Sequence, residues 1–95
     1  MELGESEIRA QNELRLEHFR AFAALPDKMP ALLEIYVTAG SEESEEQTVR
    51  RIGALFDCSD ETAFAIHNCQ LLKLHPKNQQ AIRHEIEDLE RYLGS

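Results

Sequence analysis

Tryptophan is absent from this sequence of 95 residues, and cysteine occurs only twice. No apolar run approaches the ~18 residues that a membrane-spanning helix needs, and no basic start leads into a long apolar segment. The two cysteines, Cys58 and Cys69, are too few for the disulfide framework of a small secreted domain. These absences predict a cytoplasmic protein without a membrane partner.

Basic residues are also scarce, because 10 lysines and arginines face 18 acids and leave a formal net charge of −8. The excess is uneven: residues 1–61 hold 14 acids and 6 bases, whereas residues 62–95 hold 4 of each. A negative field repels phosphate, and nucleic-acid binders normally carry a basic patch. We therefore expect no direct binding of nucleic acid.

No segment alternates polar and apolar residues with the period of a strand, so the sequence predicts an all-α fold without a sheet. The length fits a single helical domain, residues 1–95. The core of so small a domain gives marginal stability, which oligomerisation commonly supplements.

The first part of the chain is expected to form two helices separated by Pro26. Residues 6–25 carry apolar side chains at helical spacing, and a proline inside a helix removes a hydrogen bond and clashes with the preceding turn. Asp27 is then the expected N-cap of a short helix that Gly40 ends. The inner stripe predicted for this short helix consists of Met29, Leu32, Leu33 and Tyr36.

Three further helices are predicted from their caps. Ser44 and Gln47 form a capping box for a helix over about 45–56, and Ser59 caps a fourth helix that stops at His75-Pro76. The last helix is expected over about 77–93. We thus expect about five helices, the first and last as an antiparallel pair with a three-helix knob between them.

The fourth helix is apolar nearly all round, with Ala63, Phe64, Ala65, Ile66, Cys69, Leu71, Leu72 and Leu74 pointing in several directions. A domain this small covers only one such face from within, so the other predicts a homodimer seam. The predicted interface residues are Ala65, Ile66, Cys69, Leu72, Lys73 and His75. The alternative is a monomeric five-helix bundle that encloses this helix completely.

Residues 56–82, FDCSDETAFAIHNCQLLKLHPKNQQAI, resemble the dimer-forming tip of the coiled-coil domain in the A subunit of DNA gyrase and topoisomerase IV. The resemblance spans about residues 12–90. It rests on Glu13-Leu14-Arg15, Asp27, Glu45-Glu46, Phe56, Ser59-Asp60-Glu61, Ala63, Ala65-Ile66, Leu71, Leu74, Ile82 and Glu85.

That resemblance implies two long antiparallel helices ending in a helical knob, and two knobs that meet across a two-fold axis as an exit gate. The family usually has Met-Arg-Leu-Gln-Arg-Leu-Thr-Gly-Leu-Glu where this chain has Cys69 to Asn78. The loss of two arginines and of the Thr-Gly turn argues against pairing with a true gyrase subunit, because specificity depends on matched polar groups. The DNA-cleaving region of the family, with its tyrosine and acidic metal site, has no counterpart here.

No metal, cofactor or catalytic set is expected. Cys58, His67, Cys69 and His75 lack the paired spacing of zinc ligands, and no nucleophile, base and acid occur at useful spacing. The sequence therefore predicts a non-catalytic homodimerisation module, free-standing or part of a longer protein. The alternative is a small regulatory or adaptor protein that binds another helical protein, including a gyrase modulator that would inhibit supercoiling at stoichiometric doses.

Overall fold

The computed structural model describes residues 4–69 and 71–94, which form four α-helices and one short 3-10 helix. No strand occurs in these ranges, and the predicted all-α class is confirmed. The elements in chain order are α1 (Glu5–Thr38), α2 (Glu45–Phe56), α3 (Asp60–His67), the 3-10 helix η1 (Leu71–Leu74) and α4 (Pro76–Gly94).

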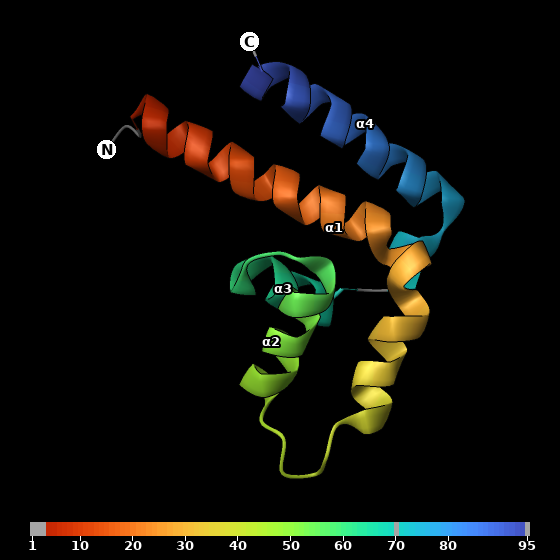
Figure 1. Cartoon of the computed structure of the whole chain (residues 1–95). Coiled ribbons are helices and arrows are strands. Elements are labelled where there is room, and N and C mark those ends of the chain that lie inside the picture. Colours follow the sequence, from red (N-terminus) through yellow and green to blue (C-terminus); the bar gives the residue numbers. More distant parts are fainter. Residues whose placement is uncertain (1–3, 70, 95) are drawn as a thin grey trace.

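The helices form a stem and a knob (Figure 1). The stem consists of α4 and the part of α1 before Pro26, which run antiparallel: the Arg9 side chain near the start of α1 donates a 2.8 Å hydrogen bond to the Leu93 carbonyl oxygen near the end of α4. The knob consists of the rest of α1 together with α2 and α3. These two short helices lie in the angle where α1 bends (Figure 1).

The expected break at Pro26 is wrong, because α1 continues for 34 residues through both Pro26 and Pro30. Pro26 has no N–H, so the Phe22 carbonyl oxygen four residues earlier lacks its helical donor. The buried side chain of Gln79 on α4 supplies that donor, since its Nε2 lies 2.9 Å from the Phe22 oxygen and 2.7 Å from the Lys73 oxygen. The two helices predicted over residues 6–40 are therefore one bent helix.

The predicted fourth helix ends earlier than expected, at His67 instead of His75. The helical ladder stops at Asn68, because its side-chain Nδ2 also donates to the Phe64 carbonyl oxygen, at 2.9 Å, and the next N–H, that of Cys69, bonds the Ile66 oxygen only three residues back. Asparagine side chains commonly compete with the helical ladder in this way. The Leu-rich remainder of the segment forms η1 instead of a continuous two-faced helix.

The local caps agree with the sequence. Ser44 and Gln47 form the reciprocal capping box of α2, whose bounds are those predicted. The Ser59 side chain accepts a hydrogen bond from the Thr62 N–H at the start of α3. Pro76 opens α4, where its missing N–H is not needed.

The core lies where α1 meets the other helices. Ile52 of α2 and Ala63 of α3 are completely enclosed, and Leu25 of α1 is 1% exposed. Buried hydrophobic residues occur along the chain at Leu16, Ala21, Phe22, Leu25, Leu32, Ile35, Val49, Ile52, Ala63, Ile66, Ile82 and Leu89. The bend of α1 thus rests on contributions from every other α-helix.

We predict that Gln79→Leu lowers the free energy of unfolding by about 1–3 kcal/mol, because it leaves the buried Phe22 carbonyl and the partly buried Lys73 carbonyl without this donor. In a Pro26→Ala background the same substitution should cost less, since an alanine in place of the proline restores an N–H to the Phe22 carbonyl. Urea denaturation of the four proteins in this double-mutant cycle measures the difference.

Gln80→Leu is the matched control, because Gln80 is the exposed neighbour of Gln79 on the same helix. An equal cost of Gln79→Leu in both backgrounds would show that the amide does not replace the missing proline N–H.

Candidate functional site

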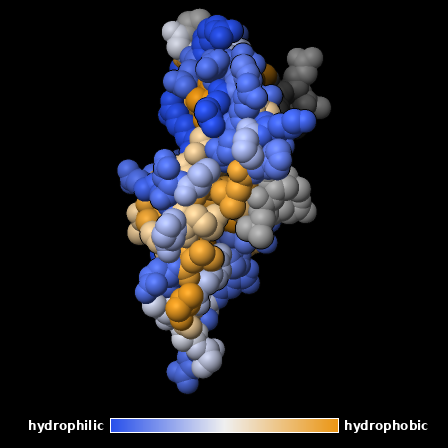
Figure 2. Space-filling view, turned by 90° about the vertical axis from the view of Figure 1, so that its right-hand side faces the viewer, coloured by the Kyte–Doolittle hydropathy of each residue, from blue (hydrophilic) through white to orange (hydrophobic). Residues whose placement is uncertain are grey.

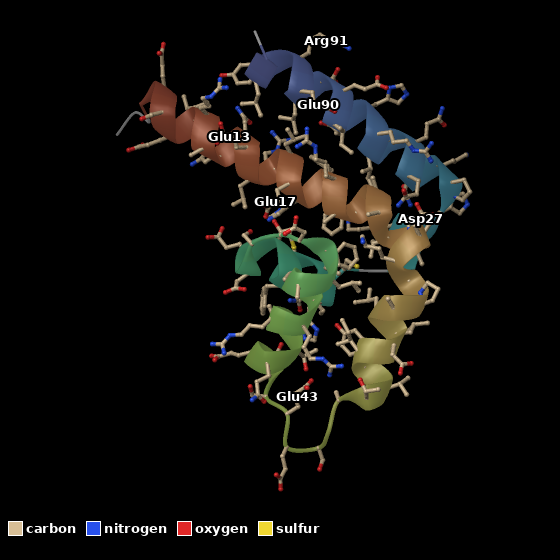
Figure 3. The ribbon with its side chains drawn as sticks, in the orientation of Figure 1. Glu13, Glu17, Asp27, Glu43, Glu90 and Arg91 are labelled. Atoms are coloured by element: carbon tan, nitrogen blue, oxygen red, sulfur yellow. The ribbon has the colours of Figure 1, made fainter. Side chains whose placement is uncertain are left out.

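A polar contact between the stem and the knob is made by Glu17 of α1, whose carboxylate points toward the start of α3 (Figure 3). One Glu17 oxygen accepts a 3.1 Å hydrogen bond from the Ser59 backbone N–H and further bonds from the hydroxyl groups of Ser59 and Thr62. Thr62 is completely buried. A negative charge at a helix N-terminus is stabilised by the helix dipole. Glu17 therefore fixes the direction of α3 relative to the stem.

This arrangement alters the ionisation of Glu17. Partial burial raises the pKa of the carboxyl group, but hydrogen bonds from the Ser59 side chain, Thr62 and the Ser59 backbone outweigh it, with His18 adding a smaller effect. The net pKa lies below the ordinary value of 4.5. Folding therefore favours the charged form.

A second network joins the three helices of the knob. The Tyr36 hydroxyl of α1 lies 2.6 Å from His67 Nδ1 of α3, and His67 Nε2 lies 3.0 Å from a carboxylate oxygen of Glu45 on α2. The Tyr36 and His67 rings also stack, with centroids 5.8 Å apart. Burial raises the pKa of Tyr36, as do Cys69 and Glu45 nearby. This hydroxyl thus stays protonated at neutral pH and acts as a structural contact.

The far end of α1 is held by Arg51 of α2. Its guanidinium donates to the Ile35 carbonyl oxygen at 3.3 Å and to the Thr38 hydroxyl at 2.7 Å, and pairs with Glu43 at 3.0 Å. Figure 3 shows Glu43 beside the start of α2. A hydrogen bond from Thr48 and the pairing with Arg51 hold the pKa of Glu43 below its usual range, against the effect of desolvation. The end of α1 and the connection to α2 are therefore fixed.

The predicted seam residues occupy different environments. Ile66 is 3% exposed and packs in the chain's own core, so its expected position at a surface seam is corrected. Ala65 and Cys69 are half-buried against that core, and His75 is exposed. The ammonium group of Lys73 lies 4.7 Å from the centre of the Phe22 ring, where cation and aromatic face attract. The side chain of Leu72 lies outside the described residues.

The exposed apolar side chains of the knob include a group on α1, where the sequence analysis predicted no seam. The α1 stripe, defined here as Met29, Leu33, Tyr36 and Val37, follows helical spacing along the knob part of α1, with Met29 half-buried against the core and the other three exposed. Val37 is 78% exposed and Leu33 is 55% exposed. Figure 2 shows hydrophobic side chains along this face of the molecule.

The α1 stripe also corrects the predicted inner stripe of residues 27–40. Leu32 is buried and Met29 packs half-buried against the core, as predicted, whereas Leu33 and Tyr36 are exposed and the omitted Ile35 is buried. The apolar arc of α1 is wider than the surface that α2 and α3 cover. All four stripe residues lie within the helix that was predicted after Pro26, so the error concerns which face of that helix packs against α2 and α3.

The chemistry of the cysteines does not point to a reactive centre. Burial raises the pKa of Cys58 most, with nearby acids adding to it, and burial also raises the pKa of Cys69 despite Lys73. Both groups are thiols at neutral pH, whereas the nucleophile and the metal ligand are thiolates. Within residues 4–69 and 71–94, no group of three or more His, Cys, Asp or Glu side chains is arranged to hold a metal ion.

Searches for relatives leave the family open. Comparison with models of protein families, with curated proteins and with solved structures finds no match to this chain. Among the described residues, none of the helices combines the length and the apolar character needed to cross a bilayer. The resemblance to the topoisomerase exit gate therefore stays a prediction that rests on the residues themselves.

We predict that Glu17→Gln lowers the free energy of unfolding at neutral pH by about 1 kcal/mol, because a neutral amide accepts weaker hydrogen bonds than a carboxylate. A group whose pKa is depressed by folding stabilises the fold above its unfolded pKa, and this stability is lost as the pH falls through the folded value. The deficit of the variant should therefore shrink as the pH drops below 4.5. Urea denaturation of the unchanged chain and the variant, at neutral pH and below pH 4.5, measures this deficit in the free energy of unfolding.

Glu7→Gln removes an exposed carboxyl from the same helix and controls for the loss of one charge. A deficit of Glu17→Gln that stays constant on acidification would contradict the role assigned to the Glu17 charge.

Proposed function

We propose that this chain is a non-catalytic homodimerisation module, similar in design to the exit-gate tip of type II DNA topoisomerase A subunits. Two copies pair through their knobs and hold two stems, or the proteins attached to them, together. The role is mechanical, and no reaction is assigned to the chain.

The observation that carries this proposal is the α1 stripe. Exposed apolar surface concentrated on one helix face is typical of protein contacts, because single exposed residues are common but contiguous ones are not. The stripe contains no charged side chain, although the chain as a whole has a net charge of −8. A second copy placed there meets neutral apolar surface, so the pairing avoids the like-charge repulsion that other faces would impose.

The arrangement of stem and knob supports the same assignment. Both chain ends lie at the end of the stem away from the knob (Figure 1). Contact through the knob therefore leaves the stems unobstructed, as in the exit gate that the sequence resembles. An isologous contact of this kind places the same helix face against itself.

We assign the centre of the seam to the α1 stripe and its margin to residues around Cys69. Tyr36 belongs to the stripe, and Cys69 lies close enough to raise its pKa. The stripe therefore continues toward residues 65–75, where the sequence predicts contacts. Ala65, Leu72, Lys73 and His75 remain proposed margin residues. Ile66 is removed from the set because it is enclosed.

A second candidate function is an adaptor that binds another helical protein, a gyrase modulator included. It is favoured by an acidic-ended groove between α2 and α3, on another part of the knob.

We predict that the chain has twice its 10.9 kDa mass at micromolar concentration, and that Leu33→Asp dissociates the pair. An unpaired charge buried at the seam costs several kcal/mol, which corresponds to roughly a hundredfold or more in the dimer dissociation constant. Sedimentation equilibrium of the unchanged and variant chains measures this, with circular dichroism as the check on folding.

Ala31→Asp is the matched control, because Ala31 is exposed on the opposite side of the same helix. It should leave the dimer intact. A monomer at micromolar concentration for the unchanged chain, or a dimer that tolerates Leu33→Asp, contradicts the proposed seam.

A further inference from the structure

An open groove of about 830 Å³ runs between α2 and α3, away from the α1 stripe. Val49 and Ala65 lie along its apolar floor, and His18 of α1 contributes to its lining. Phe64 also lines the groove and is 53% exposed. A half-exposed phenylalanine beside a buried valine provides an apolar anchor point for a side chain from outside.

Both ends of the groove are acidic. Glu45 and Glu46 occupy the first turn of α2, and Asp60 and Glu61 occupy the first turn of α3. His67 at the end of α3 contacts Glu45 at the start of α2, so the first turn of α3 lies about one α3 length from Glu45. One pair of carboxylates therefore lies at each end.

The groove has more negative charge than its own residues neutralise. Its lining holds four carboxylates and one guanidinium, that of Arg50. Among the described residues, Glu46, Asp60 and Glu61 form no ion pair, and Glu45 contacts only the imidazole of His67. Acids in first turns also stabilise their own helices, but that role leaves their carboxylate oxygens open to a cation.

We infer that this groove docks an amphipathic helix of a partner protein, with an apolar face that covers Phe64 and Val49 and with Lys or Arg at both ends. At a rise of 1.5 Å per residue, α3 is ~10.5 Å long from Asp60 to His67. Positions i and i+7 of a partner helix are separated by the same length. A partner helix with basic residues at i and i+7 and leucines between them places each base at one acidic end. Nucleic acid and anionic lipid are disfavoured here by the same charge.

The groove is distinct from the proposed homodimer seam, so the two proposals fail separately. The groove is lined by residues of α2 and α3 together with His18 of α1, whereas the centre of the seam is the α1 stripe. Ala65 is common to the groove and to the margin of the seam, so the test variants avoid it. A partner helix therefore needs no second copy of the chain in order to bind.

The test uses two synthetic helical peptides that differ only in charge, one with lysines at i and i+7 and one with glutamates there. Both carry leucines at i+3 and i+4. Titration into the ¹⁵N-labelled full chain, followed by amide shifts, should show binding of the lysine peptide only, with changes centred on Glu46, Glu61 and Phe64. Added salt should weaken this binding, since the carboxylates are exposed.

Two variants locate the contact. Phe64→Ala should weaken binding of the lysine peptide about tenfold, and Glu61→Gln should weaken it several-fold and reduce the salt dependence. Ile8→Ala, which removes an exposed apolar side chain from the stem, is the control and should leave binding unchanged. Phe64 is half-exposed, so its replacement is compatible with folding, which circular dichroism checks.

Equal binding of the two peptides, shifts confined to the α1 stripe, or no binding of the lysine peptide overturns the inference. Dissociation of the homodimer by Phe64→Ala also overturns it, because the groove would then belong to the self-contact.

Discussion

The architecture depends on the hydrogen bond between the Gln79 amide and the Phe22 carbonyl oxygen. A proline at position 26 leaves that oxygen without its helical donor, and an unsatisfied buried carbonyl costs about 1–3 kcal/mol. The amide from α4 removes this cost, so α1 bends at the proline instead of ending. The bend creates the angle in which α2 and α3 pack. Because the same amide also bonds the Lys73 carbonyl oxygen, it links η1 to the junction of stem and knob.

The sequence predicts elements whose signals are local. The capping box at Ser44 and the cap at Ser59 each depend on residues within one turn, and both occur in the structure. The missed features join residues far apart in the chain. Gln79 lies 57 residues from Phe22, and Glu17 lies 42 residues from Ser59. No periodicity within a single helix reveals such pairings.

The proposed dimer seam also shows that contacts between distant residues are hard to predict from the sequence. The sequence analysis predicted an uncovered apolar face on residues 59–75, where Ile66 is buried and Asn68 ends the helix. Such a face lies on α1 instead, where Leu33 and Val37 are exposed. Which face of residues 27–38 packs inward depends on how α2 and α3 pack against α1, whereas the early end of α3 depends on Asn68. The error in the bend of α1 and the error in the seam therefore have separate physical origins.

The two surfaces of the knob share one polar connection. Tyr36 belongs to the α1 stripe, Glu45 belongs to the rim of the acidic groove, and His67 bonds both. In the neutral imidazole one ring nitrogen donates and the other accepts, so the Tyr36 hydroxyl donates to Nδ1 while Nε2–H donates to Glu45. A cation that docks at Glu45 competes with His67 for that carboxylate. Occupation of the groove would then loosen the hold on Tyr36 at the edge of the self-pairing face, and the two contacts would affect one another through three side chains.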